Sequence, residues 1–170
     1  MKKYAVLFIV LALAGCANRP TPTATPVPVV VRTVIGDQLP DGYPAYPTID
    51  LGERAQWEGV EALLISKELM YKAGEDTELR EQLQSVIWEM VLLIIGASTQ
   101  EVRDILQMPI LNVTSERGRS VMISVRATET NILGSEMVLL PESKRLTVSA
   151  KRIDDYVRHV QEVFDQVEEK

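Results

Sequence analysis

The chain of 170 residues holds one cysteine and one histidine, Cys16 and His159. A single cysteine excludes an internal disulfide and the usual cysteine-based zinc site, and a single histidine excludes the multi-histidine sets that hold catalytic metals or haem. His159 has Asp155 four residues before it and Glu162 three residues after it, a spacing that could hold a weakly bound metal on one helical face. We favour a solvated helical face with local ion pairs, because three ligands on one exposed surface make a poor metal site.

Two charged residues fall within apolar segments. Glu89 is the one charged residue between Val86 and Ile95, and Lys67 lies on the apolar face of the preceding segment. A carboxylate in dry surroundings has a perturbed pKa, as catalytic acids do. We favour an ion pair of Glu89 with Lys67, or an edge position that reaches water, because no second acid, base or metal ligand accompanies Glu89.

Motifs that carry catalysis are missing from the sequence. It has no Gly-x-Ser-x-Gly motif, no phosphate-binding glycine loop and no His-Glu-x-x-His motif. We therefore predict that the protein is not an enzyme, with no catalytic residues, no bound metal and no dissociable cofactor.

The N-terminal residues have the pattern of an export signal. Lys2 and Lys3 precede an apolar run from Tyr4 to Ala14, and a basic start followed by a short apolar segment is typical of a secretory signal peptide. Counting from Tyr4 to Ala17 gives 14 residues. At helical rise this run is about 21 Å long, against a hydrocarbon core of about 30 Å, so it is too short to span a bilayer comfortably.

The apolar run ends in the four residues Leu13-Ala14-Gly15-Cys16. Here the chain resembles the bacterial lipoproteins, whose signal ends in a lipobox that closes on cysteine, and the resemblance covers residues 1–20 only. It implies a diacylglycerol on the thiol of Cys16, cleavage between Gly15 and Cys16, and acylation of the new amino group, for example by palmitate. Two or three acyl chains attach a protein firmly, because each buried methylene contributes about 0.8 kcal/mol. The alternatives are an ordinary signal peptide with an incidental cysteine and an uncleaved anchor.

The residues after the lipobox bear on the destination of such a lipoprotein. Ala17 and Asn18 stand where an aspartate would resemble the inner-membrane retention signal of bacteria with two membranes. The resemblance therefore implies an exported, lipid-anchored protein of the outer membrane, facing the periplasm or the surface. In a bacterium with one membrane, the protein would lie on the outer face of the plasma membrane.

The net charge excludes one class of partner. The chain has 18 basic and 24 acidic residues and a formal charge of -6. Removing Lys2 and Lys3 with the signal leaves 16 basic residues against 24 acidic ones, or -8. Nucleic-acid binders need clustered lysine and arginine, so we expect no nucleic-acid partner. Anionic lipid repels such a domain, so the lipid anchor itself would hold it at the membrane.

A proline-rich segment follows the lipobox. Seven of the nine prolines lie between Pro20 and Pro47. This composition predicts an extended spacer, in which residues 17–40 would reach about 70 Å at about 3.1 Å per residue. The valines of 29–31 could add an edge strand to the domain. The expected boundaries are a signal at 1–15, the lipidated cysteine and a Pro/Thr-rich tether at 16–50, and one globular domain at 51–170.

Two tyrosines in the spacer are candidates for interaction. Tyr43 and Tyr46 each precede a proline, as in a docking motif or an aromatic surface for sugars. We favour rings that pack on the domain, because tyrosine covers apolar surface at low entropic cost.

The periodicity of the remaining residues predicts an α+β domain. A helical hairpin is expected from helices over 53–73 and 76–95, followed by a short third helix that opens with the capping box from Ser98 to Glu101. Alternation in 121–127 indicates a strand, with 110–113 as its partner and a hairpin of 137–140 with 146–150. These strands would form an antiparallel meander of three or four. The apolar residues of 153–167 recur at helical spacing, so we expect a helix that covers the sheet rather than one that pairs with a second copy.

Two functions from different classes fit these features. The one we favour is an interaction, accessory or assembly module of a cell-envelope complex, because of the expected anchor, the spacer and the lack of a catalytic set. Its expected partners are the membrane, through the lipid, and an envelope protein. The alternative is an extracytoplasmic ligand-binding domain for peptidoglycan or a small apolar solute, with its pocket between sheet and helices.

Overall fold

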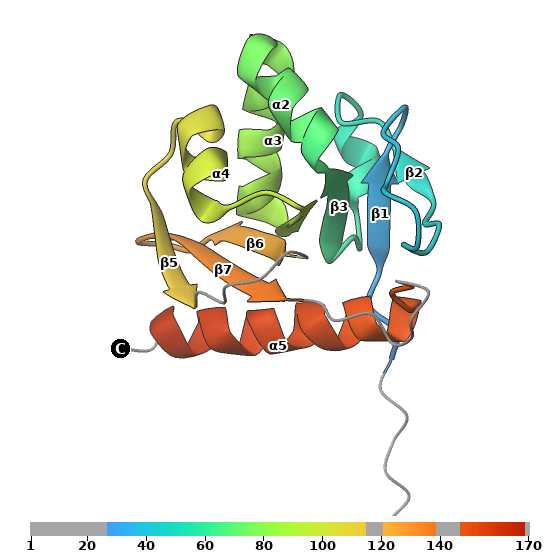
Figure 1. Ribbon diagram of the computed structural model, residues 1–170. Coiled ribbons are helices and arrows are strands. Elements are labelled where there is room, and N and C mark those ends of the chain that lie inside the picture. The colour runs from blue at the N-terminus through green and yellow to red at the C-terminus, as the bar shows by residue number, and fades with distance from the viewer. Residues whose placement is uncertain (1–26, 115–120, 139–146, 169–170) are drawn as a thin grey trace, which may run out of the picture.

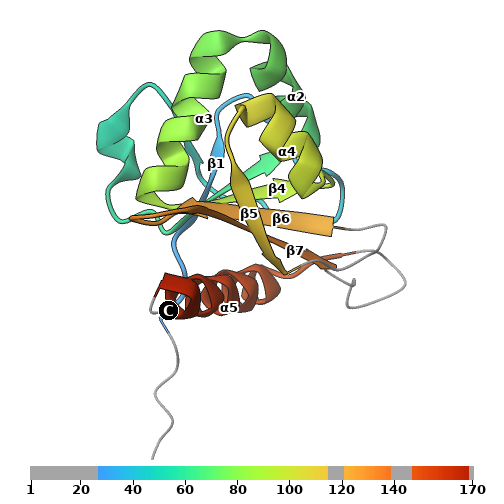
Figure 2. The ribbon, with the colours of Figure 1, turned by 90° about the vertical axis from the view of Figure 1, so that its left-hand side faces the viewer.

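A mixed β-sheet with helices on both faces forms the folded part of the chain. The computed structural model describes residues 27–114, 121–138 and 147–168. Within these residues the strands form one seven-stranded sheet (Figure 1). Three helices cover one face, and a single long helix covers the other (Figure 2). The predicted α+β class, with an antiparallel meander and a C-terminal helix packed on the sheet, is confirmed.

The described strands are β1 (Val31–Val34), β2 (Thr48–Ile49), β3 (Ala62–Ser66), β4 (Val91–Ile95), β5 (Ile110–Thr114), β6 (Val121–Ala127) and β7 (Ile132–Val138). The described helices are a short 3₁₀ helix (Arg54–Trp57), α2 (Lys67–Glu75), α3 (Thr77–Glu89), α4 (Thr99–Leu106) and α5 (Ala150–Glu168). The order across the sheet is β2-β1-β3-β4-β6-β7-β5. The first four strands are mutually parallel, β6 is antiparallel to both β4 and β7, and β5 is parallel to β7.

The first face of the sheet is covered by α2, α3 and α4. Each of these helices begins at a polar cap: Ser66 accepts from the amide of Leu69, Asp76 accepts from that of Leu79, and the predicted capping box of α4 is present. Such caps satisfy amides that have no partner within the helix. Only Asp76 separates α2 from α3, and the pair forms the expected helical hairpin in shortened form.

The second face of the sheet is covered by α5, as predicted. Its buried residues belong to a core that is distinct from the one under α2–α4, and they are Ile153, Tyr156, Val157, Val160 and Phe164. The hydroxyl of Tyr156 donates to the carbonyl of Met122 and to the hydroxyl of Ser124, both at 3.2 Å. These bonds satisfy a polar group that the helix carries into the core.

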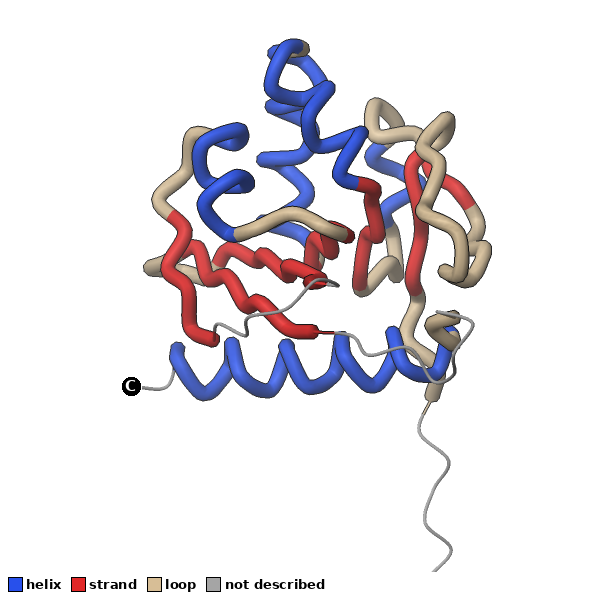
Figure 3. The backbone as a smooth tube through the Cα atoms, in the orientation of Figure 1, coloured by secondary structure: helices blue, strands red, loops and turns tan. Residues whose placement is uncertain are grey.

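Two predicted helices are wrong in their extent. The segment 53–73 contains the 3₁₀ helix, β3 and the first part of α2, while 76–95 contains α3 and then β4 (Figure 3). Every residue of β3 and β4 is buried. A parallel strand covered on both faces reads as a continuous apolar run, and a short run of this kind looks the same as a buried helix.

The predicted pairing of the strands after residue 110 is also wrong. The segment from Ile110 pairs in parallel with β7 and not with β6. The expected hairpin of 137–140 with 146–150 is replaced by β7 and by α5, which begins at Ala150, while 139–146 lie outside the described residues. Parallel pairing of β5 with β7 requires a crossover, which a local hairpin pattern cannot reveal.

The domain begins earlier than the expected boundary at Leu51. β1 lies between β2 and β3 instead of at the edge of the sheet, and Val29 and Val31 are buried under α5. The described part of the expected tether from Val29 onward therefore contributes to the fold, and residues 17–26 lie outside the described residues. Within the described ranges, no helix combines the length and the apolar character that a membrane span needs.

Candidate interaction surface

The residues considered for metal binding do not gather into a cluster within the described structure. Gly15 and Cys16 lie outside the described residues. His159 and Asp155 are exposed on α5. No cluster of three potential metal-ligating side chains occurs in the described residues.

Lys67 has an ion-pair partner other than the expected Glu89. Its Nζ lies 2.9 Å from Oε1 of Glu101, and Tyr71 donates to the same oxygen at 2.7 Å. Glu89 is exposed at the end of α3. The hydrogen bond from Tyr71, followed by that from Lys67, holds the pKa of Glu101 at about 2. The cluster joins α2 to the start of α4, so we interpret it as a structural contact.

The carboxyl ends of the parallel strands, where open α/β sheets commonly bind ligands, carry internal contacts. Asp37, after β1, accepts hydrogen bonds from both the amide and the hydroxyl of Ser66 at the start of α2. The amide of Thr99, at the start of α4, donates to Oε1 of Glu136 at 2.7 Å. Carboxylates of the chain itself thus occupy the positions that an anionic ligand would take at these helix ends.

Tyr43 and Tyr46 pack on the domain. Both rings are half-buried against the core under α5. Burial, with a smaller effect of Asp154, raises the pKa of Tyr46 to about 12. This placement agrees with the packing that we favoured over a docking motif.

The most exposed aromatic side chain of the described residues is Trp88, at 59%. It lies one residue before the end of α3, whose buried face is made by Leu83, Val86 and Ile87. The helix ends at Glu89 and the chain continues into β4. The ring of Trp88 is not part of the buried face of the helix, so it lies in solvent. The sequence prediction missed Trp88 because it treated 86–95 as a buried helix. The available signal was that, at helical spacing, Trp88 falls away from the face that Leu83, Val86 and Ile87 share.

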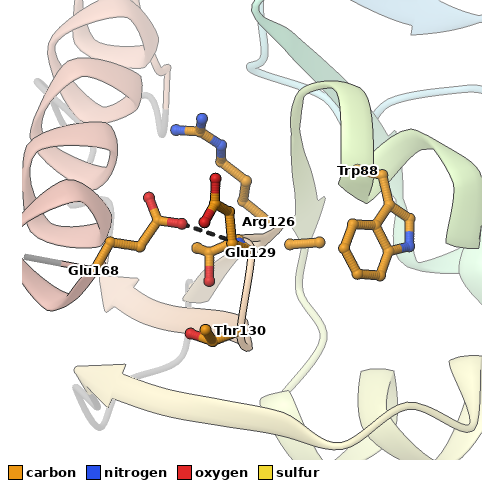
Figure 4. Close-up of a pocket in the computed structure, with 7 residues that line it drawn as sticks. Trp88, Arg126, Glu129, Thr130 and Glu168 are labelled. Carbon is orange, nitrogen blue, oxygen red and sulfur yellow. Dashed lines mark hydrogen bonds between the residues drawn. The ribbon is translucent and has the colours of Figure 1, made fainter.

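Two depressions lie beside Trp88. Both are lined by Trp88, Glu129 and Thr130. The larger, about 680 Å³, is also lined by Arg126, Ala127, Thr128 and Glu168. The smaller, about 300 Å³, is also lined by Pro109, Leu111, Asn131 and Ile132. In the larger one, Trp88 stands apart from the charged side chains Arg126, Glu129 and Glu168 (Figure 4). We call the residues of both depressions the Trp88 surface.

The turn between β6 and β7 is held by hydrogen bonds at both ends. Within it, the amide of Thr128 donates to the carbonyl of Asn131 at 2.8 Å, and the amide of Asn131 donates to the hydroxyl of Thr128 at 3.2 Å. The amide of Glu129 donates to Oε1 of Glu168 at 3.1 Å, which ties the turn to the end of α5. The polar side of the Trp88 surface is therefore positioned by backbone contacts.

The apolar side of the surface depends on how β5 is seated. Ile110 is buried, and the next residue, Leu111, is 52% exposed because successive side chains of a strand point to opposite faces. Gly134 of β7 makes room for this seat: a Cβ there would lie 2.6 Å from Cγ2 of Ile110. The close approach of the two strands thus fixes the position of Leu111 beside β7.

The side chains of the Trp88 surface are of mixed character, with an aromatic ring, aliphatic groups, hydroxyls, one arginine and carboxylates. They include no cysteine, histidine or lysine. An exposed tryptophan and an arginine are residue types that are enriched at recognition surfaces. No protein-family model, curated protein or solved structure matches the chain, so this interpretation depends on the side chains themselves.

Proposed function

We propose that the protein is a membrane-anchored lipoprotein whose folded domain binds a partner protein through the Trp88 surface. It would act as an interaction, accessory or assembly module of a cell-envelope complex. The observation that carries the proposal is the exposure of Trp88 beside Leu111, at 59% and 52%. Tryptophan contributes more than most residues to binding energy at protein interfaces, and grouped exposed apolar side chains mark such interfaces.

The expected anchor supports the same proposal. The lipobox that ends at Cys16 would hold the domain at a membrane through acyl chains. Where the described chain begins, the carbonyl of Val27 accepts a hydrogen bond from Arg158 of α5. Glu168 lies ten residues further along this helix, or about 15 Å at helical rise. The Trp88 surface is thus set apart from the point where the tether joins the domain.

A ligand-binding domain remains the alternative, in the form of a glycan-binding domain. The specific observation that favours it is that Thr130, Arg126 and Glu129 line the larger depression together with Trp88. A sugar ring can stack on an aromatic face while its hydroxyls bond to such groups. An apolar solute between the sheet and the helices is less favoured, because Leu83, Ile94 and Ile123 fill that space as fully buried residues.

Affinity purification of the full chain from detergent-solubilised membranes tests the proposal. We expect a defined protein to co-purify with the wild type and to be lost with Trp88→Ala. The matched control is Ile35→Ala. Ile35 is also 59% exposed, but it follows β1, which lies towards the opposite edge of the sheet from β7 and β5. Equal recovery of every co-purifying protein with wild type and Trp88→Ala would contradict the proposal. Sedimentation with purified peptidoglycan that Trp88→Ala abolishes would favour the alternative.

A further inference from the structure

The C-terminal end of α3 lies at the Trp88 surface. This helix ends at Glu89, next to Trp88, while Glu168, the last described residue of α5, lines the larger depression. The C-terminal end of a helix carries the equivalent of about half a negative charge, and lysine or arginine in the last turn usually compensates it. α3 has no basic residue in its last turn.

The side chains of the larger depression add to this negative charge. Glu129 and Glu168 are exposed carboxylates, and the one basic residue among the lining residues is Arg126. Nη1 of Arg126 lies 3.6 Å from Oδ1 of Asp165, so its charge is directed at a third carboxylate. The depression therefore presents an excess of acidic groups within the described residues.

We infer that the Trp88 surface binds a segment of a partner protein that is both positively charged and apolar. A bulky apolar side chain of this segment would occupy the smaller depression against Trp88 and Leu111. A lysine or arginine would lie in the larger one, near Glu129 and Glu168. This inference rests on the proposed function and names the chemistry of the partner.

The observed groups favour such a segment over other occupants. A bulky apolar side chain gains burial against Trp88 and Leu111, which are 59% and 52% exposed, and a cation beside it gains attraction from the nearby carboxylates. Anionic lipid and nucleic acid would be repelled by the carboxylates and by the C-terminal end of α3. A net charge of -8 without the signal would also steer basic partners toward the domain.

The experiment uses the full chain in nonionic detergent and two labelled peptides as probes. One is a basic peptide in which lysine and arginine alternate with leucine, and the other has glutamate and aspartate in place of the basic residues. Fluorescence anisotropy of the label reports binding. We expect the basic peptide to bind and the acidic peptide not to bind. Raising the salt from about 0.01 M to about 0.15 M shortens the Debye length from about 30 Å to about 8 Å, so the affinity should fall several-fold.

Variants assign the binding to the surface. Replacing both Glu129→Gln and Glu168→Gln removes two charges and keeps the oxygen that accepts from the turn, and we expect a loss in affinity of about threefold to tenfold. Trp88→Ala should weaken binding by more than about tenfold. The control Asp155→Asn removes an exposed carboxylate thirteen residues before Glu168 on α5 and should leave the affinity unchanged.

Three outcomes would overturn the inference: equal binding of the two peptides, no binding of either, or an affinity that the double variant leaves unchanged. They are distinguishable from failure of the proposed function. If a partner protein co-purifies in a Trp88-dependent manner while the basic peptide does not bind, the interaction module stands and the charge of its partner is wrong. If Trp88→Ala leaves every complex intact, the proposed function itself fails.

Discussion

Replacing Val160 with aspartate should remove most of the stability of the domain. Val160 is 0% exposed and lies on the face of α5 that packs against the sheet. Its core also contains Leu64, Leu93 and Leu133 from three strands. Among the described residues of that core, no lysine or arginine is buried that could pair with an introduced carboxylate.

The expected cost has two parts. Loss of the buried valine side chain costs about 1.5 to 3 kcal/mol. Burial raises the pKa of a carboxyl by about 3 to 5 units, to about 7 to 9, so the folded variant holds the proton at neutral pH. Holding it costs about 1.4 kcal/mol for each pH unit above the unfolded pKa of about 3.9, or about 4 kcal/mol at pH 7. The sum approaches the whole stability of a typical domain, about 5 to 15 kcal/mol. We therefore expect Val160→Asp to be largely unfolded at neutral pH.

The pH dependence separates the charge from the lost packing. An introduced carboxyl with a raised folded-state pKa carries no charge penalty below its unfolded pKa of about 3.9, and it carries the full penalty above the raised value. The neutral control Val160→Asn has nearly the same shape. The difference in free energy of unfolding between the two variants should therefore be near zero at about pH 4 and grow as the pH rises.

Urea denaturation followed by circular dichroism measures this difference, with sedimentation to report association. Val167→Asp is the exposed control on the same helix, since Val167 is 37% exposed, and it should change stability by less than about 1 kcal/mol. A wild-type denaturation curve for Val160→Asp at neutral pH would refute the packing described for α5. Loss of a dimer or complex with the fold intact would mean that the helix face binds a partner.

Three further predictions concern other parts of the chain. Glu101→Gln should cost about 1 kcal/mol, because the side chain of Glu101 is 37% exposed and water screens its contacts. The pKa of Glu101 is lowered to about 2, so its contribution to the free energy of unfolding is present above the ordinary pKa of 4.5 and is lost as the pH falls through about 2. Urea denaturation should therefore show the free energies of unfolding of wild type and Glu101→Gln converging over this range. A difference that does not change with pH would count against the contact. A chain that starts at residue 27 should show a cooperative thermal transition, and a chain that starts at residue 51 should not, because it lacks β1, β2 and the buried Val31. A transition in both chains would mean that these strands are dispensable. Cys16→Ser should accumulate as an uncleaved precursor, whereas the wild type partitions into the detergent phase; recovery of wild type in the aqueous phase with an unmodified N-terminus would reject lipidation.

The sequence predicted the elements whose signals are local. The capping box from Ser98 to Glu101 and the apolar stripe of α5 each depend on residues close together in the chain, and both elements were found as expected. β3 and β4 were taken for parts of helices, because their apolar runs record burial on both faces and carry no alternation. The placement of β1 and β5 depends on parallel pairing with distant strands, which no local pattern specifies.

The candidate surface was harder to predict than the fold. Tyr43 and Tyr46 attracted attention because of their repeated motif, yet their rings pack on the domain. Trp88 has no motif around it, and its exposure depends on where α3 stops. The end of that helix in turn depends on Val91 and its neighbours joining the sheet as β4. An exposed position of this kind follows from tertiary pairing and not from the residues beside it.

The arrangement of α5 has a consequence for the order of folding. The core under this helix joins Val29, near the start of the described chain, to Phe164, near its end. Contacts between such distant residues are slow to form, because a long loop must close before they are gained. A chain that emerges from its N-terminus cannot cover that face of the sheet until its last helix has appeared. Until α5 has been synthesised, Leu64 and Leu93 would be exposed and could contact other chains. Rapid completion of the chain, or a chaperone that binds this face of the sheet, would therefore limit aggregation.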